Sequence, residues 1–173
     1  MFQLLYTQPA EVVTADCAQL QAATSTIDIA AYSLTHPQII SVVEAAAKRG
    51  VRVRVYLDHE ELAASIRDAG GLARSPIAPL INQPNIAIRV KESSILMHLK
   101  SYCVDLKLLR DGSANLTQPG ESVQDNSAIW TDEPIALARW AQKFTEMWTR
   151  LNNLSPEQIE ASISERPRRE RVL

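Results

Sequence analysis

The sequence has few cysteines, no long apolar run and no internal repeat. Only Cys17 and Cys103 occur among its 173 residues, and each lies in an apolar segment. This favours buried free thiols over a disulfide. No segment approaches the ~18 consecutive apolar residues that a membrane span needs, so the sequence predicts no span.

An excess of charge of either sign is also lacking. The 18 Lys and Arg residues nearly balance the 20 Asp and Glu residues, which leaves a net charge of −2. No general attraction to nucleic acid or to an anionic membrane is therefore expected, and any basic surface must be local. Residues 1–9 contain no basic segment followed by a long apolar one, so no signal peptide is visible and we expect a cytoplasmic protein.

The strongest functional signal is a set of polar and glycine residues with fixed spacing, H-x-K-x4-D-x6-G-S-x-N. Residues 96–104 mix β-branched, apolar and polar side chains, which predicts a strand on which residues two apart share a face. We therefore expect the first two motif residues to project together, and a turn at 111–112 to bring the last two beside them. The motif consists of His98, Lys100, Asp105, Gly112, Ser113 and Asn115.

The chemistry of these side chains suits a tetrahedral anion. Lys100 supplies a point charge, and Ser113 and Asn115 supply hydrogen-bond donors, so a phosphate is the natural ligand. A lone histidine is a poor metal ligand set, and the sequence predicts neither a metal nor another cofactor.

The spacing resembles the HKD motif of the phospholipase D superfamily, which this sequence carries once. Residues 29–35 (IAAYSLT) and 47–53 (AKRGVRV) are similar to the first βαβ unit of its short bacterial members, which are endonuclease-like and related to mitochondrial phospholipase D-like proteins. The resemblance covers roughly residues 26–150. It implies an α/β fold, an α/β/α sandwich with a central mixed, largely parallel sheet, active as a C2 homodimer. We expect a catalytic domain over 1–154, then a C-terminal helix and flexible basic tail over 155–173.

One motif supplies one histidine, and neither His36 nor His59 is followed two residues later by a lysine. A symmetric homodimer would bring two copies of His98 to one phosphate. By resemblance, one His98 attacks phosphorus to form a phosphohistidine, while the other protonates the leaving alcohol and then activates water. The substrate-binding residues Lys100, Ser113 and Asn115 would hold the non-bridging oxygens without a divalent metal.

Three further assignments follow from the resemblance. The family usually has an acidic residue after G-S-x-N, in a pattern like S-E-N, that orients the catalytic histidine. Here residues 124–126 are Q-D-N, so Asp125 is the candidate orienting residue, with an ordinary strand-end carboxylate as the alternative. Asp105 lies away from the phosphate in the family, so we count it and Gly112 as structural.

The motif indicates a phosphodiester and says little about its substituents. The small relatives are mostly nucleases, so a non-specific endonuclease on DNA or RNA is favoured. A phospholipase D-type hydrolase of a lipid such as cardiolipin is the alternative, although the sequence shows no amphipathic stretch suited to docking on a bilayer. A third possibility is a nucleic-acid-binding dimer that does not cleave.

The rest of the chain predicts alternating strands and helices. Thr35 is the expected N-cap of the second helix, which Gly50 ends. Aromatic residues four apart near residues 140–148 predict core or dimer packing more than a platform for bases. The expected strands are 2–6, 27–32, 51–57, 86–90, 96–104 and 126–131, and the expected helices are 9–23, 35–50, 60–69 and 134–151.

Overall fold

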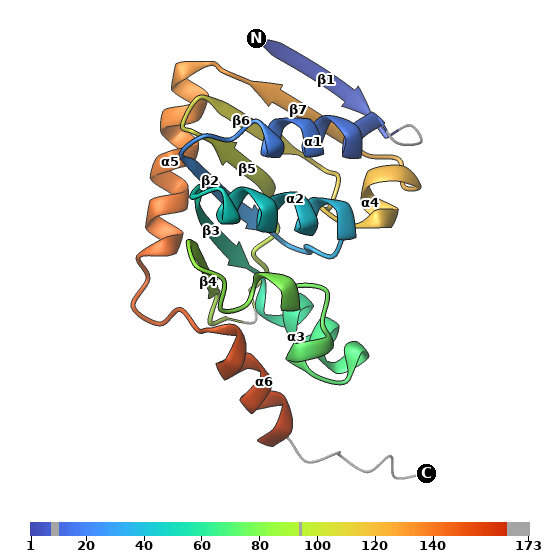
Figure 1. Ribbon diagram of the computed structural model, residues 1–173, viewed down its shortest axis with the longest axis vertical. Helices are drawn as coiled ribbons and strands as arrows, with labels where there is room; N and C mark the ends of the chain where they lie inside the picture. Colours follow the sequence, from blue (N-terminus) through green and yellow to red (C-terminus); the bar gives the residue numbers. More distant parts are fainter. Residues whose placement is uncertain (8–10, 94, 166–173) are drawn as a thin grey trace.

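A seven-stranded mixed sheet forms the centre of the fold (Figure 1). The computed structural model describes residues 1–7, 11–93 and 95–165. The strands lie in the order β1-β7-β6-β5-β2-β3-β4. Their bounds are β1 Phe2–Tyr6, β2 Thr26–Ala31, β3 Arg52–Leu57, β4 Ile86–Val90, β5 Lys100–Val104, β6 Leu108–Gly112 and β7 Ser127–Thr131.

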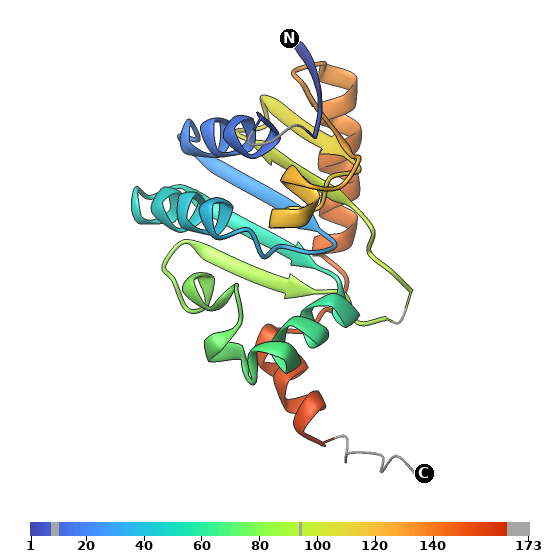
Figure 2. The same cartoon turned by 90° about the vertical axis from the view of Figure 1, so that its right-hand side faces the viewer.

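Helices cover both faces of the sheet, which gives three layers (Figure 2). Helices α1 and α2 lie on one face and α5 on the other, while α3 and α6 pack together near β4. Among the described residues, none of the helices has the length and hydrophobicity required to span a membrane. The helix bounds are α1 Glu11–Gln21, α2 Pro37–Lys48, α3 His59–Ala69, α4 Gln118–Ser122, α5 Pro134–Trp148 and α6 Pro156–Glu165, with short 3-10 turns at Leu72–Arg74 and Ala78–Leu80.

Alternating side chains of the strands build two cores, one on each face. On β5, Tyr102 and Val104 join the core under α1 and α2, whereas Cys103 joins the core under α5. The aromatic residues of α5 belong to this second core: the rings of Trp140 and Phe144 stack at 5.0 Å, and both side chains are buried. They are therefore packing residues. Both cysteines are free thiols.

The prediction of a largely parallel sheet is wrong. Only the β2–β3 and β3–β4 pairs are parallel, and the four other strand pairs are antiparallel. The first half of the chain crosses between strands through helices, which permits parallel pairing. In the second half, β5 and β6 are joined by only three residues, and so short a connection permits only an antiparallel pair.

The hairpin that carries the motif turns at a different place from the one predicted. The turn uses Asp105 and Leu106, both at φ +53°, and β5 begins only at Lys100. The predicted turn at 111–112 lies instead within β6. Gly112 is required there for another reason: its φ is +153°, and a Cβ would lie 2.2 Å from the carbonyl oxygen of Ser127 on β7.

The predicted cap of α2 is also wrong. His36 is the N-cap in place of Thr35, because its Nδ1 accepts a hydrogen bond from the Gln38 N–H at 3.3 Å. Burial lowers the pKa of His36, with the negative charge of Asp16 opposing the shift. A neutral imidazole keeps the unprotonated nitrogen that this cap needs.

The C-terminal helix expected within 155–173 is α6, whose Ile159 is buried in the core beside α3. The Glu160 carboxylate accepts a hydrogen bond from the Leu72 N–H at 2.7 Å, which ties α6 to the turn after α3. The predicted basic tail falls on residues 166–173, outside the described part of the chain.

Candidate active site

The first half of the motif lies at the start of β5. His98 is exposed, whereas Lys100 is only 6% exposed and donates a hydrogen bond from Nζ to the His98 carbonyl oxygen at 2.9 Å. An accessible imidazole therefore lies next to a nearly buried ammonium group.

The chain around His98 is anchored although it does not belong to a strand. The Met97 N–H donates to the Asp58 carboxylate at 2.7 Å, and the Tyr32 N–H donates to the Leu99 carbonyl oxygen at 2.7 Å. Asp58 also caps α3, so one buried carboxylate joins that helix to the motif. These bonds fix the backbone on both sides of His98.

The second half of the motif follows β6. The Ser113 Oγ accepts a hydrogen bond from the Ser127 N–H at 3.0 Å, so this hydroxyl is engaged with β7. The Oδ1 atom of Asn115 is buried and has no hydrogen-bond partner within the described residues. A buried amide oxygen without a partner is costly in a fold and common at a binding site.

Arg110 brings the two halves together. Its Nη1 donates to the carbonyl oxygens of Lys100 at 2.6 Å and of Ala114 at 3.0 Å. Its Nη2 lies 3.3 Å from Asp16 and 3.1 Å from Glu121, and all three side chains are fully buried. The histidine–lysine segment and the serine–asparagine segment therefore lie side by side over one buried guanidinium.

The sequence motif did not include this buried network, although one signal was present. Asp16 falls on the apolar stripe of the first helix, together with Val12, Val13 and Leu20. A carboxylate in that position requires a buried partner, and Arg110 on β6 supplies it. The Tyr102 hydroxyl also donates to Asp16, at 2.7 Å.

Burial shifts the pKa of two groups in this region. Burial lowers the pKa of Lys100; the carboxylates of Glu61 and Asp58 oppose the shift, and the positive charge of Arg110 adds to it. Burial and the negative charge of Asp16 raise the pKa of Glu121 to about 9, against the opposing charge of Arg110. Both causes favour the protonated, uncharged form of the Glu121 carboxyl.

Asp105 and Asp125, the two acidic residues predicted to support the site, lie in different parts of the fold. Asp105 is at the far end of β5, where its carboxylate accepts hydrogen bonds from the backbone and side chains of Thr24 and Ser25 and from the Thr26 N–H. Asp125 is exposed in the connection between α4 and β7. No hydrogen bond joins Asp125 to His98 in the part of the chain that is described.

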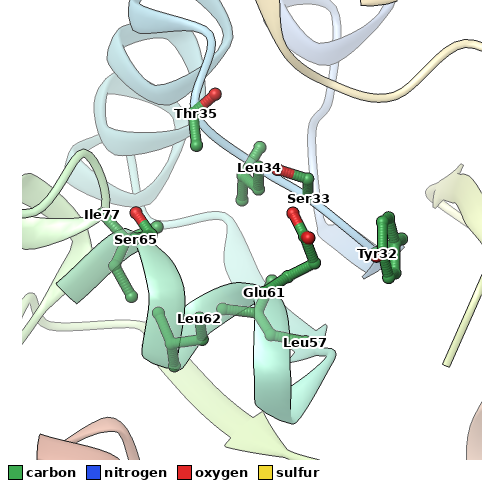
Figure 3. A pocket seen from close by; sticks show the side chains of 9 residues that line it. All are labelled: Tyr32, Ser33, Leu34, Thr35, Leu57, Glu61, Leu62, Ser65 and Ile77. Carbon is green, nitrogen blue, oxygen red and sulfur yellow. The ribbon is translucent and has the colours of Figure 1, made fainter. Parts of the chain in front are cut away.

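A pocket opens beside the site, between the end of β2 and the start of α3 (Figure 3). Tyr32, Ser33, Thr35, Glu61 and Ser65 supply its polar groups, over an apolar floor. Within residues 1–7, 11–93 and 95–165, no group of three or more His, Cys, Asp or Glu side chains is arranged to hold a metal ion.

The family follows from comparison with known proteins. The model of the family described as "Cardiolipin synthase, PLD-like domain" matches residues 17–148, which include both halves of the site. The chain therefore belongs to the phospholipase D-like family.

Individual relatives add detail. The chain is 28% identical over 129 residues to a mitochondrial cardiolipin hydrolase of Chlamydomonas reinhardtii, which covers 75% of this chain and 54% of the relative. It is 27% identical over 135 residues to the human mitochondrial cardiolipin hydrolase, covering 77% of this chain and 49% of the relative. It thus spans about half the length of the curated relatives it matches.

Solved structures share the fold over nearly their whole length. NucT from Helicobacter pylori superposes with a TM-score of 0.73 at 21% identity, over 86% of this chain and 95% of NucT. The phospholipase D family member Nuc from Salmonella typhimurium gives a TM-score of 0.70 at 23% identity, over 89% of this chain and 99% of Nuc. At these identities the likeness concerns the fold.

Proposed function

We propose that the protein is a metal-independent phosphodiesterase that acts as a C2 homodimer. The observation that carries the proposal is that Arg110 binds the carbonyl oxygens of Lys100 and Ala114, which places the two halves of the motif side by side. These halves carry the exposed His98 imidazole, the nearly buried Lys100 ammonium and the Asn115 amide, whose buried Oδ1 has no partner within the described residues. The Lys100 ammonium and the N–H groups of the Asn115 amide are donors of the kind that stabilise the charge that develops on a phosphate in the transition state.

The reaction needs two histidines. The His98 imidazole of one subunit attacks phosphorus, and the bond to the leaving oxygen breaks as the second His98 donates a proton to it. The second His98 then takes a proton from water, whose oxygen attacks phosphorus and breaks the P–N bond of the phosphohistidine. Lys100 and Asn115 bind the non-bridging oxygens. The role of orienting His98 is proposed for Asp125, although no hydrogen bond joins these two residues in the described part of the chain.

Exposed apolar side chains support a dimer around this site. Ile95 and Leu96, just before His98, are 74% and 52% exposed, and Val123, two residues from Asp125, is 78% exposed. Large exposed apolar side chains are typical of a surface that another molecule covers.

Nucleic acid is the substrate that we propose first. The chain resembles single-motif endonuclease-like members, and its fold is shared with Nuc and NucT over nearly their whole length. A cardiolipin-type phospholipid is the second candidate, because seven curated relatives are named mitochondrial cardiolipin hydrolases.

The test is cleavage of labelled single- and double-stranded DNA and RNA in excess EDTA, and of cardiolipin vesicles, with sedimentation to measure the oligomer. We expect a dimer that cleaves nucleic acid in EDTA, and a His98→Ala variant that loses this activity. His59→Ala, at a histidine outside the motif, is the matched control and should keep the activity. Cleavage that EDTA abolishes, or that survives in His98→Ala, would contradict the mechanism. Hydrolysis of vesicles alone would select the lipid, and binding without cleavage would indicate a non-cleaving DNA- or RNA-binding dimer.

A further inference from the structure

One aromatic residue outside the motif contacts both its histidine and its lysine. The ring centroids of Tyr32 and His98 are 4.7 Å apart, with the planes at 65°, an edge-on arrangement. The Lys100 Nζ lies 4.8 Å from the centroid of the same ring. The Tyr32 ring is therefore the common neighbour of the exposed imidazole and the nearly buried ammonium.

The backbone of Tyr32 is fixed at the same point. Tyr32 directly follows β2, and its N–H donates to the carbonyl oxygen of Leu99, the residue between His98 and Lys100. The ring and the segment that it contacts are thus held in one register by the sheet.

Tyr32 shares its pocket with the first turn of α3. Burial raises the pKa of Tyr32, and the negative charges of Glu61 and Asp58 add to the shift. Glu61 lies in that turn, and its carboxylate points towards Ser33 in the pocket that Tyr32 also lines (Figure 3). Asp58, which caps this helix, also binds the Met97 N–H, so the start of α3 is tied to the residue before His98.

This arrangement meets a requirement of the proposed reaction. His98 is exposed, and a free imidazole on a surface samples several rotamers, whereas attack on phosphorus needs one orientation at close range. An edge-on aromatic contact restricts the imidazole, and a cation–π contact holds the Lys100 ammonium beside it.

We propose that Tyr32 is a positioning residue: its ring holds the His98 imidazole and the Lys100 ammonium in their relative places. The proposal rests on the proposed function and extends it to a residue outside the HKD motif. It assigns the role to the ring and not to the hydroxyl, so substitutions that remove one or the other can test it.

The kinetic test compares Tyr32→Leu, which removes the ring, with Tyr32→Phe, which keeps it. The assay measures kcat and KM for hydrolysis of bis(p-nitrophenyl) phosphate. We expect Tyr32→Leu to lower kcat by ~100-fold, the usual cost of a misplaced catalytic group, with KM changed by less than about threefold. Tyr32→Phe should restore kcat to within about fivefold of the wild type. Ser65→Ala, in the same pocket, is the matched control and should change neither constant.

A spectroscopic measurement on the wild-type protein does not depend on any variant folding. With isotope-labelled histidine, we expect nuclear Overhauser contacts between the Tyr32 ring and the His98 imidazole. In the folded variants, we expect Tyr32→Phe to keep the ring-current shift of the His98 signals and Tyr32→Leu to lose it. Absence of these contacts, a Tyr32→Leu variant with wild-type kcat, or a Tyr32→Phe variant as slow as Tyr32→Leu would overturn the assignment. Failure of the proposed function would give a different result. The His98→Ala variant would keep its activity, while the wild-type protein would still show the Tyr32–His98 contacts.

Discussion

The two ends of β5 carry polar clusters that differ in how fully the chain satisfies them. At the far end, the Asp105 carboxylate accepts hydrogen bonds from Thr24, Ser25 and Thr26, so its bonding capacity is filled from within the protein. At the near end, the His98 imidazole is exposed and the Asn115 Oδ1 has no partner among the described residues. The same HKD spacing supplies both clusters.

This difference predicts a structural role for the far end of the motif and a functional role for the near end. A satisfied cluster lowers the free energy of the fold, whereas a cluster with open hydrogen-bonding positions is available to a ligand. Substitutions at the far end should therefore act on stability, and substitutions at the near end should act on catalysis. Arg110, beneath the near end, is the exception, because it supports the open cluster from inside the core.

The largest expected effect is that of Arg110→Met. This variant leaves the buried groups of Asp16 and Glu121 without their cation, so we expect the free energy of unfolding to fall by about 3–5 kcal/mol. Denaturant unfolding measures the change. A triple variant that also carries Asp16→Leu and Glu121→Met removes the stranded polar groups and should recover part of the loss. An unchanged midpoint in Arg110→Met would mean that the network contributes nothing.

Asn115→Ala should give the next largest effect, on rate. Loss of one donor aimed at a developing negative charge typically lowers kcat by about 10²–10³-fold. Because the Asn115 Oδ1 has no partner in the described structure, stability should change by less than about 1 kcal/mol. Steady-state kinetics and thermal unfolding of the same preparation check both parts. A large loss of stability would show that the amide is structural and that the two ends of β5 are alike.

Asp105→Ala should show the reverse pattern. Burial opposes ionisation of this carboxyl, but hydrogen bonds from Thr26, Thr24 and Ser25 outweigh it and lower the pKa. We expect a stability loss of about 1–2 kcal/mol at pH 7, in the lower part of the usual range because solvent screens a half-buried group. Activity per folded molecule should stay within about threefold.

The pH dependence of Asp105 has a definite sign. Since its folded pKa is lowered, its contribution is complete above the unfolded value of about 3.9 and is lost as the pH falls below it. The stability difference between the wild type and Asp105→Ala should therefore shrink between pH 6 and pH 3. A difference that stays constant over this range would contradict the role of the ionised carboxylate.

Glu121→Gln is expected to have the smallest effect at mildly acidic pH. The pKa of Glu121 is raised to about 9, so its favourable contribution is present below the unfolded value of about 4.3 and is lost as the pH rises towards 9. Glutamine resembles the protonated form, so the two proteins should differ by less than about 1 kcal/mol at pH 5. The variant should become the more stable of the two at pH 8. Unfolding curves at both pH values check this, and parallel curves would contradict it.

Much of the fold could be predicted because it depends on local patterns. Alternation over Arg52–Leu57 and Ile86–Val90 and the helical stripe of α2 are properties of short segments, and the strands and helix lie within a few residues of the predicted bounds. The sequence also determined which side chains we propose to bind a phosphate, because the HKD spacing is local. The misplaced turn at 111–112 and the parallel sheet were errors of pairing, which involves residues far apart in the chain.

Only the tertiary structure decided which neighbours complete the site. Two of these neighbours, Tyr32 and Asp58, directly follow β2 and β3, and the third, Arg110, lies on β6. They contact His98, Met97 and Lys100 respectively, and each contact joins residues at least ten positions apart in the sequence. Periodicity carries no information about such contacts, because it reports which face a residue occupies and not what lies opposite. The sequence therefore named the groups that we propose to react, and the packing of β2 and β6 against β5, with β3 beside β2, determined how they are held.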